Sequence, residues 1–296
     1  MSEPDARAMR QVQLSNATNF ERYTSQSAIL ARLADHHGYE RGLVFGGSYG
    51  LEAARLAILM PPARFVTADI DPRVTEIARA SFRSPRIEPV LSSWETLEGA
   101  GPYDFITANS VLCRHPLPRD VTKLEAYGFA EFEDMLARLV AMLRPGGAMM
   151  VCNPSYCVRD TDPSIGLSAV RAPRPLHGFT SLFDRESRLL VHAPQTLAYL
   201  TPQYFVAPDA DADELFERVT ESVFVKGPID PVVERPAPSL STDEWETVAA
   251  FDPYTDGLMP APPKDGVPLR YEMRIMHQGD RVPRLVYLRD GEPFDY

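Results

Sequence analysis

The stretch LVFGGSYGLE at residues 43–52 decides the fold. An apolar run ends at Phe45, glycines follow at positions 46, 47 and 50, and an apolar helical pattern begins at Leu51. A glycine-rich turn between a strand and a helix lets the backbone approach a ligand closely and adopt φ angles that other residues avoid. Such a turn indicates a nucleotide-like ligand and leaves open which one.

Strand and helix patterns alternate on both sides of this turn. Strands are predicted at 42–45, 64–68, 87–91, 104–108 and 148–152, and helices at 25–36, 51–60, 72–82 and 129–143. Two further strands are predicted at 269–276 and 284–288. Strands separated by helices are typical of a doubly wound parallel sheet. We therefore expect an α/β, Rossmann-like fold with a seven-stranded sheet, parallel with an antiparallel closing strand, and a long Pro-rich insertion.

The prolines divide the chain, because ten of the 28 precede residue 153 and eighteen follow it. We predict four parts: an N-terminal helical cap at 1–40, a ligand-binding core at 41–156, a loop-rich lid or substrate-specificity insertion at 157–266, and a closing β-hairpin of the core sheet at 267–296. Within the insertion, the patterns predict a hairpin at 179–192 and a helix at 209–224.

Composition excludes several classes of function. The formal net charge of -11, without a basic stripe, argues against a nucleic acid partner. The N-terminus has no apolar signal core and the longest apolar stretch is too short for a membrane span, so we expect a cytoplasmic protein without a membrane segment. Three cysteines without framework spacing fit a reducing compartment, and no motif predicts a metal site. A homodimer stays open.

The sequence of the turn narrows the range of ligand classes. It fails the G-x-G-x-x-G dinucleotide pattern because Ser48 occupies the second glycine position, and it fails the phosphate-loop pattern because no lysine follows Gly50. Asp69 ends the next strand, nineteen residues after Gly50, where a carboxylate can accept both hydroxyls of a ribose. Asp71, directly before Pro72, is the better helix cap. The pattern predicts a ligand with a ribose and no phosphates.

Four segments in this order resemble the class I S-adenosylmethionine-dependent methyltransferases: GGSYGLEAARLAIL, ADIDPRVTEIAR, YDFITANSVL and LARLVAMLRPGGAMMV. The resemblance covers residues 41–156 and is nearest in flavour to the branch of the chemotaxis receptor glutamate methyltransferases. That branch has a basic N-terminal domain with an arginine-containing motif, whereas NFERYTSQSA is not arginine-rich, and Ser110 stands where that branch has asparagine. We therefore expect a small-molecule acceptor instead of a receptor glutamate.

The resemblance implies S-adenosyl-L-methionine as the cofactor and assigns roles to residues at the matching positions. The turn would lie under the methionine part, Asp69 would hold the ribose, and the residues after the third and fourth strands would contact the adenine and the sulfonium. Trp94 has ordinary packing as an equal alternative. The implied cofactor-binding residues are Gly46, Gly47, Ser48, Gly50, Asp69, Ile70, Ser93, Trp94, Asn109 and Ser110.

Candidates for the chemistry lie beyond the fourth and fifth strands. His115 is a candidate base, or a loop histidine bonded to backbone, and Arg114 is a candidate carboxylate ligand, or a surface ion pair. Tyr156 is a third catalytic candidate, while Tyr23 and His177 are candidate substrate contacts. The NPSY stretch at 153–156 resembles the [ND]-P-P-Y motif of amino-group methyltransferases but follows the fifth strand instead of the fourth. We interpret it as a strand end at the pocket rim.

The predicted function is methyl transfer from S-adenosylmethionine to a small molecule, with secondary metabolism as the expected setting. Two alternatives stay open. One keeps the fold and cofactor but transfers or cyclises the aminocarboxypropyl arm. The other is a non-catalytic binding or regulatory module, motivated by the missing acidic residue before the turn.

Overall fold

The computed structural model describes residues 9–13, 18, 20, 22–115, 117–118, 120–170, 180–193, 205–206, 221–229, 246–252, 271–277, 283–289 and 291–293. Its helices are α1 (Thr24–His37), α2 (Leu51–Leu59), α3 (Pro72–Ser81), α4 (Trp94–Ala100) and α5 (Phe129–Ala141), with 3-10 turns η1 (Val158–Asp160) and η2 (Pro163–Ile165). Its strands are β1 (Arg41–Phe45), β2 (Arg64–Asp69), β3 (Ile87–Leu91), β4 (Tyr103–Thr107), β5 (Leu143–Met150), β6 (Leu167–Ala169), β7 (Thr180–Phe183), β8 (Leu189–Ala193), β9 (Phe205–Val206), β10 (Val223–Lys226), β11 (Glu246–Phe251), β12 (Tyr271–His277), β13 (Arg284–Arg289) and β14 (Glu292–Pro293).

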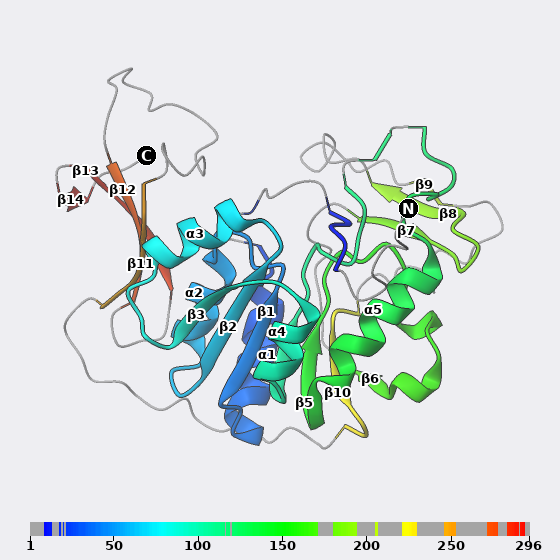
Figure 1. Cartoon of the computed structure of the whole chain (residues 1–296), viewed down its shortest axis with the longest axis horizontal. Coiled ribbons are helices and arrows are strands. Elements are labelled where there is room, and N and C mark those ends of the chain that lie inside the picture. The colour runs from blue at the N-terminus through cyan, green and yellow to red at the C-terminus, as the bar shows by residue number, and fades with distance from the viewer. Residues whose placement is uncertain are drawn as a thin grey trace. The chain divides into compact units, whose positions relative to one another are not determined.

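The main sheet confirms the predicted fold class. It has seven strands in the order β3-β2-β1-β4-β5-β10-β6 (Figure 1). The β1–β2, β2–β3 and β4–β5 pairs are parallel, and β10 runs antiparallel to both β5 and β6. The sheet is therefore the Rossmann-like, mostly parallel sheet that the alternating patterns predicted.

The chain divides into two compact units. Unit 2 comprises residues 17–22, 31–92 and 233–296, and contains β1 to β3 with α2 and α3. Seven of the nine α2 residues are buried, and this helix packs against β2, β3, β11 and β12 of the same unit. Asp71 caps α3 by accepting a hydrogen bond from the Arg73 amide, as predicted, and Pro72 occupies the first helical turn. These caps fix where β2 ends and α3 begins.

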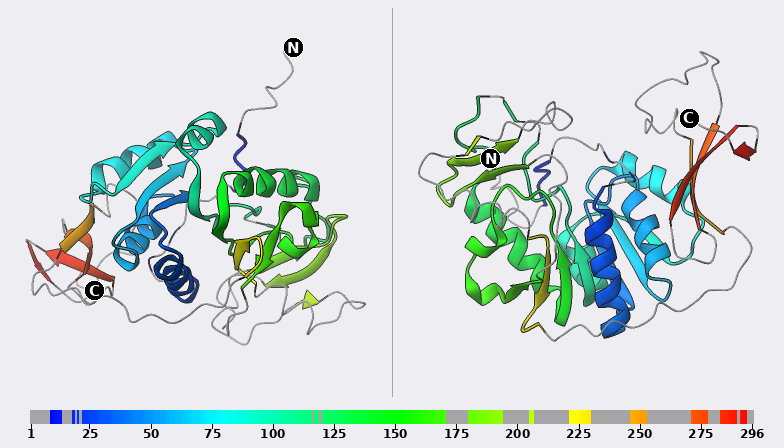
Figure 2. Two further views of the ribbon diagram at one scale, coloured as in Figure 1. Left: turned by 90° about the horizontal axis from the view of Figure 1, so that it is seen from below. Right: turned by 180° about the vertical axis from the view of Figure 1, so that it is seen from behind.

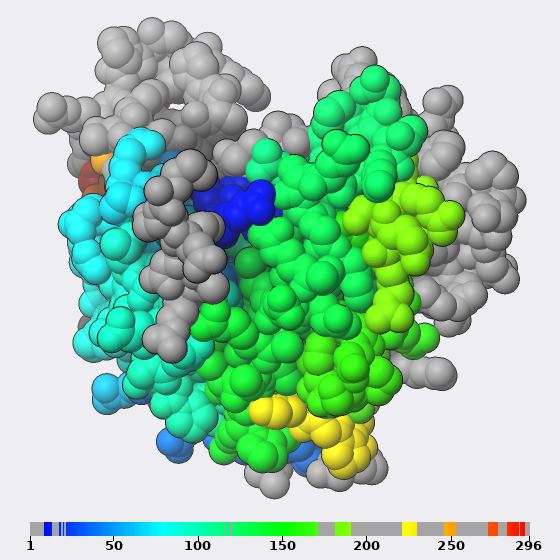
Figure 3. All heavy atoms as spheres, turned by 45° about the vertical axis from the view of Figure 1, so that its right-hand side comes forward, coloured from blue at the N-terminus to red at the C-terminus, as the bar shows by residue number. Residues whose placement is uncertain are grey.

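Unit 1 comprises residues 1–16, 23–30 and 93–232. Its longest amphipathic helix, α5, buries Phe132, Leu136 and Leu139 and packs on β5. The Nζ of Lys226 donates to the carbonyls of Val140 and Leu143, which closes the C-terminal end of α5. Part of the segment 9–13, dark blue in Figure 3, is exposed at the surface, while Val12 within it is buried.

The C-terminal strands belong to a different sheet from the one predicted. We expected residues 267–296 to close the core sheet, but β12 and β13 pair with β11 and β14 in a four-stranded sheet. Figure 2 shows β11 to β13, orange to red, as a ribbon of their own beside α2 and α3 of unit 2. The antiparallel neighbour of β5 is instead β10, which lies inside the segment predicted as an insertion.

Smaller differences concern element bounds. The strand β5 begins at Leu143, so the RPGG stretch, which was predicted to end the preceding helix, is part of the strand. Gly146 within this stretch has a φ of 74°. The pairing of β4 with β5 shifts its register here, between Tyr103 and Phe105 of β4. The helix α4 was not predicted. The hairpin expected at 179–192 is confirmed as β7 and β8.

Most of the predicted lid at 157–266 lies outside the described residues, including most of the helix expected at 209–224, whose last two positions are in β10. In the part of the chain that is described, no helix combines the length and the apolar character needed to cross a bilayer.

Candidate functional site

The glycine turn after β1 has an alternating left-handed backbone. Gly46, Ser48 and Gly50 have φ angles of 67°, 49° and 90°. The Gly47 amide donates to the carbonyl of Ala68 at 3.0 Å, and the Gly50 amide donates to the carbonyl of Gly47 at 2.9 Å. The turn is therefore tied both to itself and to the end of β2.

Two of these glycines are required by space as well as by backbone angle. A Cβ at Gly47 would lie 2.1 Å from Thr67 Oγ1, and a Cβ at Gly50 would lie 2.3 Å from Cζ of Phe82. A side chain at Gly47 would have to displace the buried Thr67, and one at Gly50 would have to displace the ring of Phe82, which is half-buried. The turn thus brings bare backbone to the carboxyl ends of β1 and β2, where ligands bind in sheets of this kind.

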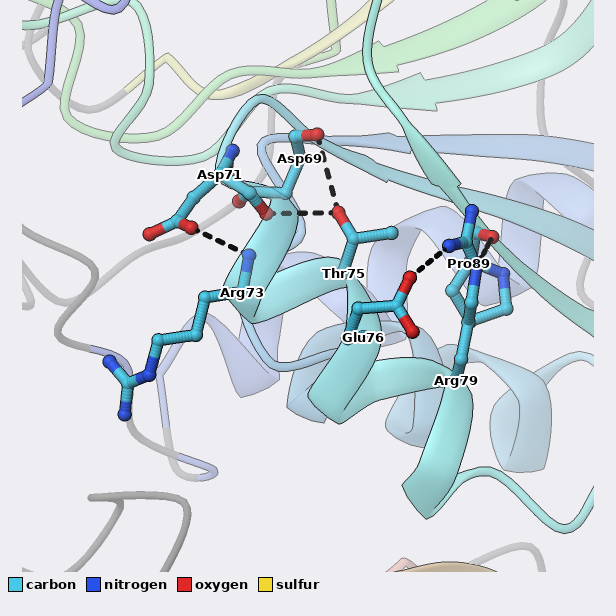
Figure 4. A network of polar contacts seen from close by, with 7 residues as sticks. All are labelled: Asp69, Asp71, Arg73, Thr75, Glu76, Arg79 and Pro89. Carbon is cyan, nitrogen blue, oxygen red and sulfur yellow. Dashed lines mark hydrogen bonds and ion pairs between the residues drawn. The ribbon is translucent and has the colours of Figure 1, made fainter.

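Asp69 joins the turn to the start of α3. One carboxylate oxygen accepts a hydrogen bond from the Ser48 amide at 2.9 Å, and the other accepts one from the Asp71 amide at 2.9 Å. Thr75 donates to the backbone carbonyls of Asp69 and Asp71 and so holds this corner together (Figure 4). An ionised carboxylate has about four acceptor sites, so it retains acceptor capacity beyond these two bonds.

Burial sets the charge behaviour of this carboxylate. Asp69 is 8% exposed, and desolvation raises the pKa of its carboxyl above the ordinary 3.8, with the amides of Asp71 and Ser48 opposing that shift. A buried acceptor at the end of β2 is suited to a ligand that carries hydroxyl donors. Residues 43–54 contain no lysine or arginine, so the turn brings no cation to a phosphate.

Arg55 is the first cation along the chain after the turn, and its contacts are structural. Its guanidinium donates to the Arg22 carbonyl and lies 4.9 Å from the Phe20 ring centroid. The side chain is 2% exposed. Arg55 therefore holds the segment ahead of α1 in unit 2.

Ser93 and Trp94, the two candidate residues that follow β3, have local contacts within unit 1. Ser93 is the N-cap of α4, and its Oγ accepts a hydrogen bond from the Thr96 amide. Trp94 is buried, and the guanidinium of Arg138 lies 4.2 Å from its ring centroid. The structure therefore accounts for Trp94 by packing, which was one of its two predicted roles.

The residues after β4 are bonded to the segment after β5. The Oδ1 of Asn109 accepts a hydrogen bond from the Cys152 amide at 3.0 Å, and the Ser110 amide donates to the Cys152 carbonyl at 2.8 Å. Ser110 Oγ lies 2.6 Å from the Tyr23 hydroxyl, and Asn153 Nδ2 donates to both of these hydroxyl oxygens. Unit 1 thus brings together two predicted site residues, Tyr23 and Ser110, and adds Asn153, which had not been predicted as a site residue.

The VLCRHP segment has a structural anchor. Arg114 donates from its amide to Ser155 Oγ at 3.1 Å and from Nη1 to the Val12 carbonyl at 2.9 Å, so its guanidinium holds the N-terminal segment 9–13. Cys113 is buried and lies 3.8 Å from Gln13 Nε2. His115 is half-buried in the same segment. The carboxylate-binding role expected of Arg114 has no support in these contacts.

The catalytic role expected of Tyr156 is corrected. Its side chain is fully buried, and its hydroxyl donates to the Tyr127 carbonyl at 2.6 Å and bonds with Ser187 Oγ at 2.8 Å. Its ring packs against Phe129, Phe132 and other aromatic rings, and burial raises the pKa of its phenol. Tyr156 is a core residue because its side chain turns into the aromatic cluster behind the end of β5.

The last two predictions concern His177 and the absence of a metal site. His177 lies outside the described residues. Among the residues that are described, no three His, Cys, Asp or Glu side chains are grouped as a metal site would require.

No protein family model matches the sequence, and no curated protein matches it. Solved structures do match over part of the fold. An O-methyltransferase family protein from Burkholderia thailandensis is 13% identical, with a TM-score of 0.35 over 50% of this chain and 42% of the other. The plantazolicin methyltransferase BpumL in complex with SAH is 14% identical, with a TM-score of 0.34 over 45% of this chain and 46% of the other.

A third match is CalS10, an amino pentose methyltransferase from Micromonospora echinaspora involved in calicheamicin biosynthesis and solved with bound SAM. It is 20% identical, with a TM-score of 0.34 over 48% of this chain and 53% of the other. The chain thus spans about half the length of the solved proteins that it matches. At this level of similarity, substrate and site residues have to be argued from the chain's own geometry.

Proposed function

We propose that this protein is an S-adenosylmethionine-dependent methyltransferase that acts on a small molecule. The observation that carries the proposal is the bond between Asp69 and the glycine turn. A buried carboxylate at the end of β2 accepts from Ser48 of the turn while keeping acceptor capacity for a ligand. This arrangement suits the two hydroxyls of a ribose.

The residues present fit this cofactor better than a nucleotide with phosphates. Gly47 and Gly50 leave space for close approach, which a Cβ would fill. The absence of lysine and arginine from residues 43–54 leaves a pyrophosphate without a counter-charge. A ligand with a ribose and no phosphate satisfies both conditions.

S-adenosylmethionine supplies, when bound, a methyl group on a positively charged sulfur whose departure needs no proton. The chain's own task is then to hold the acceptor in line, and well-oriented groups of this kind reach effective molarities of about 10⁵ M or more. We propose that Ile70, Asn109 and Ser110 contribute to holding the cofactor. A base is needed only for an acceptor that starts protonated.

The acceptor is proposed to be a small molecule, with segment 157–266 supplying specificity. The segment is proline-rich, and loops on a rigid scaffold are where specificity is usually carried. The net charge of -11 disfavours a nucleic acid acceptor. Nothing in the contacts of Arg114 favours a carboxylate acceptor such as a protein glutamate.

Binding and product analysis test the proposal. We expect isothermal titration to show micromolar binding of S-adenosylmethionine and S-adenosylhomocysteine, and turnover with an acceptor to release S-adenosylhomocysteine. No binding of either compound at millimolar concentration would contradict the proposal and favour a non-catalytic module. Release of methylthioadenosine would instead assign transfer of the aminocarboxypropyl arm.

The raised pKa of Asp69 predicts that the affinity for the cofactor decreases at acidic pH. As the pH falls through this raised pKa, protonation removes the charge and one acceptor, so affinity for S-adenosylhomocysteine should decrease at a higher pH than an ordinary aspartate would cause. Titration calorimetry over a pH series that is lowered toward the ordinary aspartate pKa of 3.8 measures this decrease. Asp69→Asn should lack it, and an identical decrease in Asp69→Asn would contradict the assignment.

The raised pKa of Asp69 has the opposite effect on the stability of the free protein, which should increase as the pH falls. The folded state binds this proton more tightly than the unfolded state, so this group's contribution to the free energy of unfolding is greatest below pH 3.8 and is lost as the pH rises through the raised pKa. Relative to Asp69→Asn, the wild type should therefore gain stability while it loses cofactor affinity as the pH falls.

A further inference from the structure

Three segments that are far apart in the sequence meet in one hydrogen-bonded cluster of unit 1. Tyr23 immediately precedes α1, Ser110 follows β4, and Asn153 follows β5. The Tyr23 hydroxyl and Ser110 Oγ are 2.6 Å apart. Asn153 Nδ2 lies 2.9 Å from the Tyr23 hydroxyl and 3.2 Å from Ser110 Oγ. We call Tyr23, Ser110 and Asn153 the amide–hydroxyl cluster.

All three residues of the cluster have a left-handed backbone. Their φ angles are 61°, 54° and 54°, and only five non-glycine residues in the described part of the chain have a positive φ. A left-handed backbone at a residue other than glycine is unfavourable and persists only where the surroundings impose it. Asn153 also precedes Pro154, and a residue before proline normally adopts an extended conformation. The surrounding structure therefore imposes a left-handed backbone at all three residues of the cluster.

Hydrogen bonds join the two segments that carry Ser110 and Asn153. Beyond the paired ends of β4 and β5, the Ala108 amide donates to the backbone carbonyl of Met150, and the Ser110 amide donates to the backbone carbonyl of Cys152. The Asn109 side chain adds a third bond, to the Cys152 amide. Ser110 and Asn153 are therefore held at the carboxyl ends of two parallel strands, the edge where ligands bind in α/β sheets.

The hydrogen bonds of the cluster orient the Asn153 amide. Its Nδ2 carries two hydrogens, and the two hydroxyl oxygens of Tyr23 and Ser110 take one each. Its Oδ1 has no partner within the described residues, and the side chain is half-buried. The cluster thus presents a carbonyl oxygen, which accepts hydrogen bonds and carries no net charge.

We propose that Asn153 is a specificity-determining residue whose Oδ1 accepts a hydrogen bond from an O–H or N–H group of the methyl acceptor, with Tyr23 and Ser110 as positioning residues. This inference rests on the proposed function. A hydroxyl acceptor carries a hydrogen for this bond before methylation and has none on that oxygen afterwards. The cluster therefore favours an O–H substrate over its O-methylated product.

Matched ligand pairs test the proposal without knowledge of the natural acceptor. The probes are phenol with anisole, aniline with N,N-dimethylaniline, and cyclohexanol with methoxycyclohexane, each pair differing in the donor. Each is titrated into ¹⁵N-labelled full-length protein with and without saturating S-adenosylhomocysteine, and the dissociation constants are obtained by NMR. We expect the donor of at least one pair to bind about fivefold more tightly than its methylated partner, with a shift of the Asn153 side-chain amide signal.

Two variants of Asn153 separate recognition from folding. Asn153→Gly removes the amide at a φ of 54° that glycine adopts without strain, and it should abolish the donor preference. Asn153→Asp keeps an acceptor oxygen, tolerates the left-handed backbone and can still bond with both hydroxyls, so it should retain the preference. Thermal unfolding checks that both variants fold.

The outcomes distinguish this inference from the proposed function. It is overturned if Asn153→Gly keeps the donor preference, if no donor probe binds the wild type at millimolar concentration, or if Asn153→Gly weakens S-adenosylhomocysteine binding and leaves the preference intact. The last result would assign Oδ1 to the cofactor. A donor preference that depends on Asn153 in a protein that does not bind S-adenosylhomocysteine would support the cluster while refuting the methyltransferase proposal.

Discussion

Asp69→Ala should weaken binding of S-adenosylmethionine and S-adenosylhomocysteine at least tenfold, which corresponds to about 1.4 kcal/mol. The substitution removes the charged acceptor proposed for the ribose hydroxyls, and hydrogen bonds to charged groups contribute more than neutral ones. It also removes the bond from the Ser48 amide that ties the turn to β2. Titration calorimetry of both ligands measures the change.

Asp71→Ala is the matched control for this prediction. Asp71 lies two residues further along, and its carboxylate caps α3 through the Arg73 amide (Figure 4). Its loss should lower the free energy of unfolding by about 0.5–2 kcal/mol and leave ligand affinity within twofold of wild type. If the two variants lost affinity equally, Asp69 would affect ligand binding by stabilising the connection between β2 and α3 and not by contacting the ligand. Unchanged affinity in Asp69→Ala would refute its role as a ribose ligand.

The part of the fold that the sequence predicts well is the part determined by local patterns. The helix α5 was predicted from apolar residues at helical spacing, and it buries residues at that spacing, among them Phe132, Leu136 and Leu139. Strand β3 has the predicted bounds, and the cap at Asp71 follows from its place directly before Pro72. In these elements one periodicity dominates a whole segment, so no distant contact is needed to identify them.

The errors come from short elements and from distant pairing. The helix α4 has seven residues with two buried positions, Trp94 and Leu97, too few for a periodic pattern, and the only local signal is Ser93 as N-cap. The alternation in β12 correctly predicts a strand with one buried face, but it does not specify which strand pairs with it. β10 has four residues, and its place beside β5 is a distant contact that a local pattern does not encode.

The same distinction applies to the candidate site. Asp69 was predicted because its position at the end of β2 is fixed by chain order relative to the turn. The hydrogen bonds of Asn153 with Tyr23 and Ser110 were not predicted, because they depend on how three distant segments fold together. The one local signal was an Asn-Pro pair at a strand end. Tyr156 was misassigned because the chain order gives its position and not the direction of its side chain.

Gly47→Ala should lower the free energy of unfolding by about 1–3 kcal/mol, the usual cost of overpacking. The added Cβ would lie 2.1 Å from Thr67 Oγ1, and Thr67 is buried in β2 directly beneath the turn. Gly47 does not have a positive φ, so the cost arises from this contact and not from backbone strain. Urea unfolding and S-adenosylhomocysteine titration should both detect the change.

A compensating substitution and a control glycine make this prediction specific. Thr67→Ala removes Oγ1, after which the nearest contacts of the new Cβ are Val44 Cγ1 at 3.3 Å and Thr67 Cβ at 3.4 Å. The Gly47→Ala/Thr67→Ala double variant should therefore recover most of the lost stability and affinity relative to Thr67→Ala. Gly99→Ala, where no atom lies within 4 Å of the added Cβ, should be neutral or stabilising by up to about 1 kcal/mol. The double variant removes the contact between the added Cβ and Thr67 Oγ1 and leaves the rest of the turn unchanged. If Thr67→Ala does not restore stability, Gly47 is required for a reason other than the space beside Thr67.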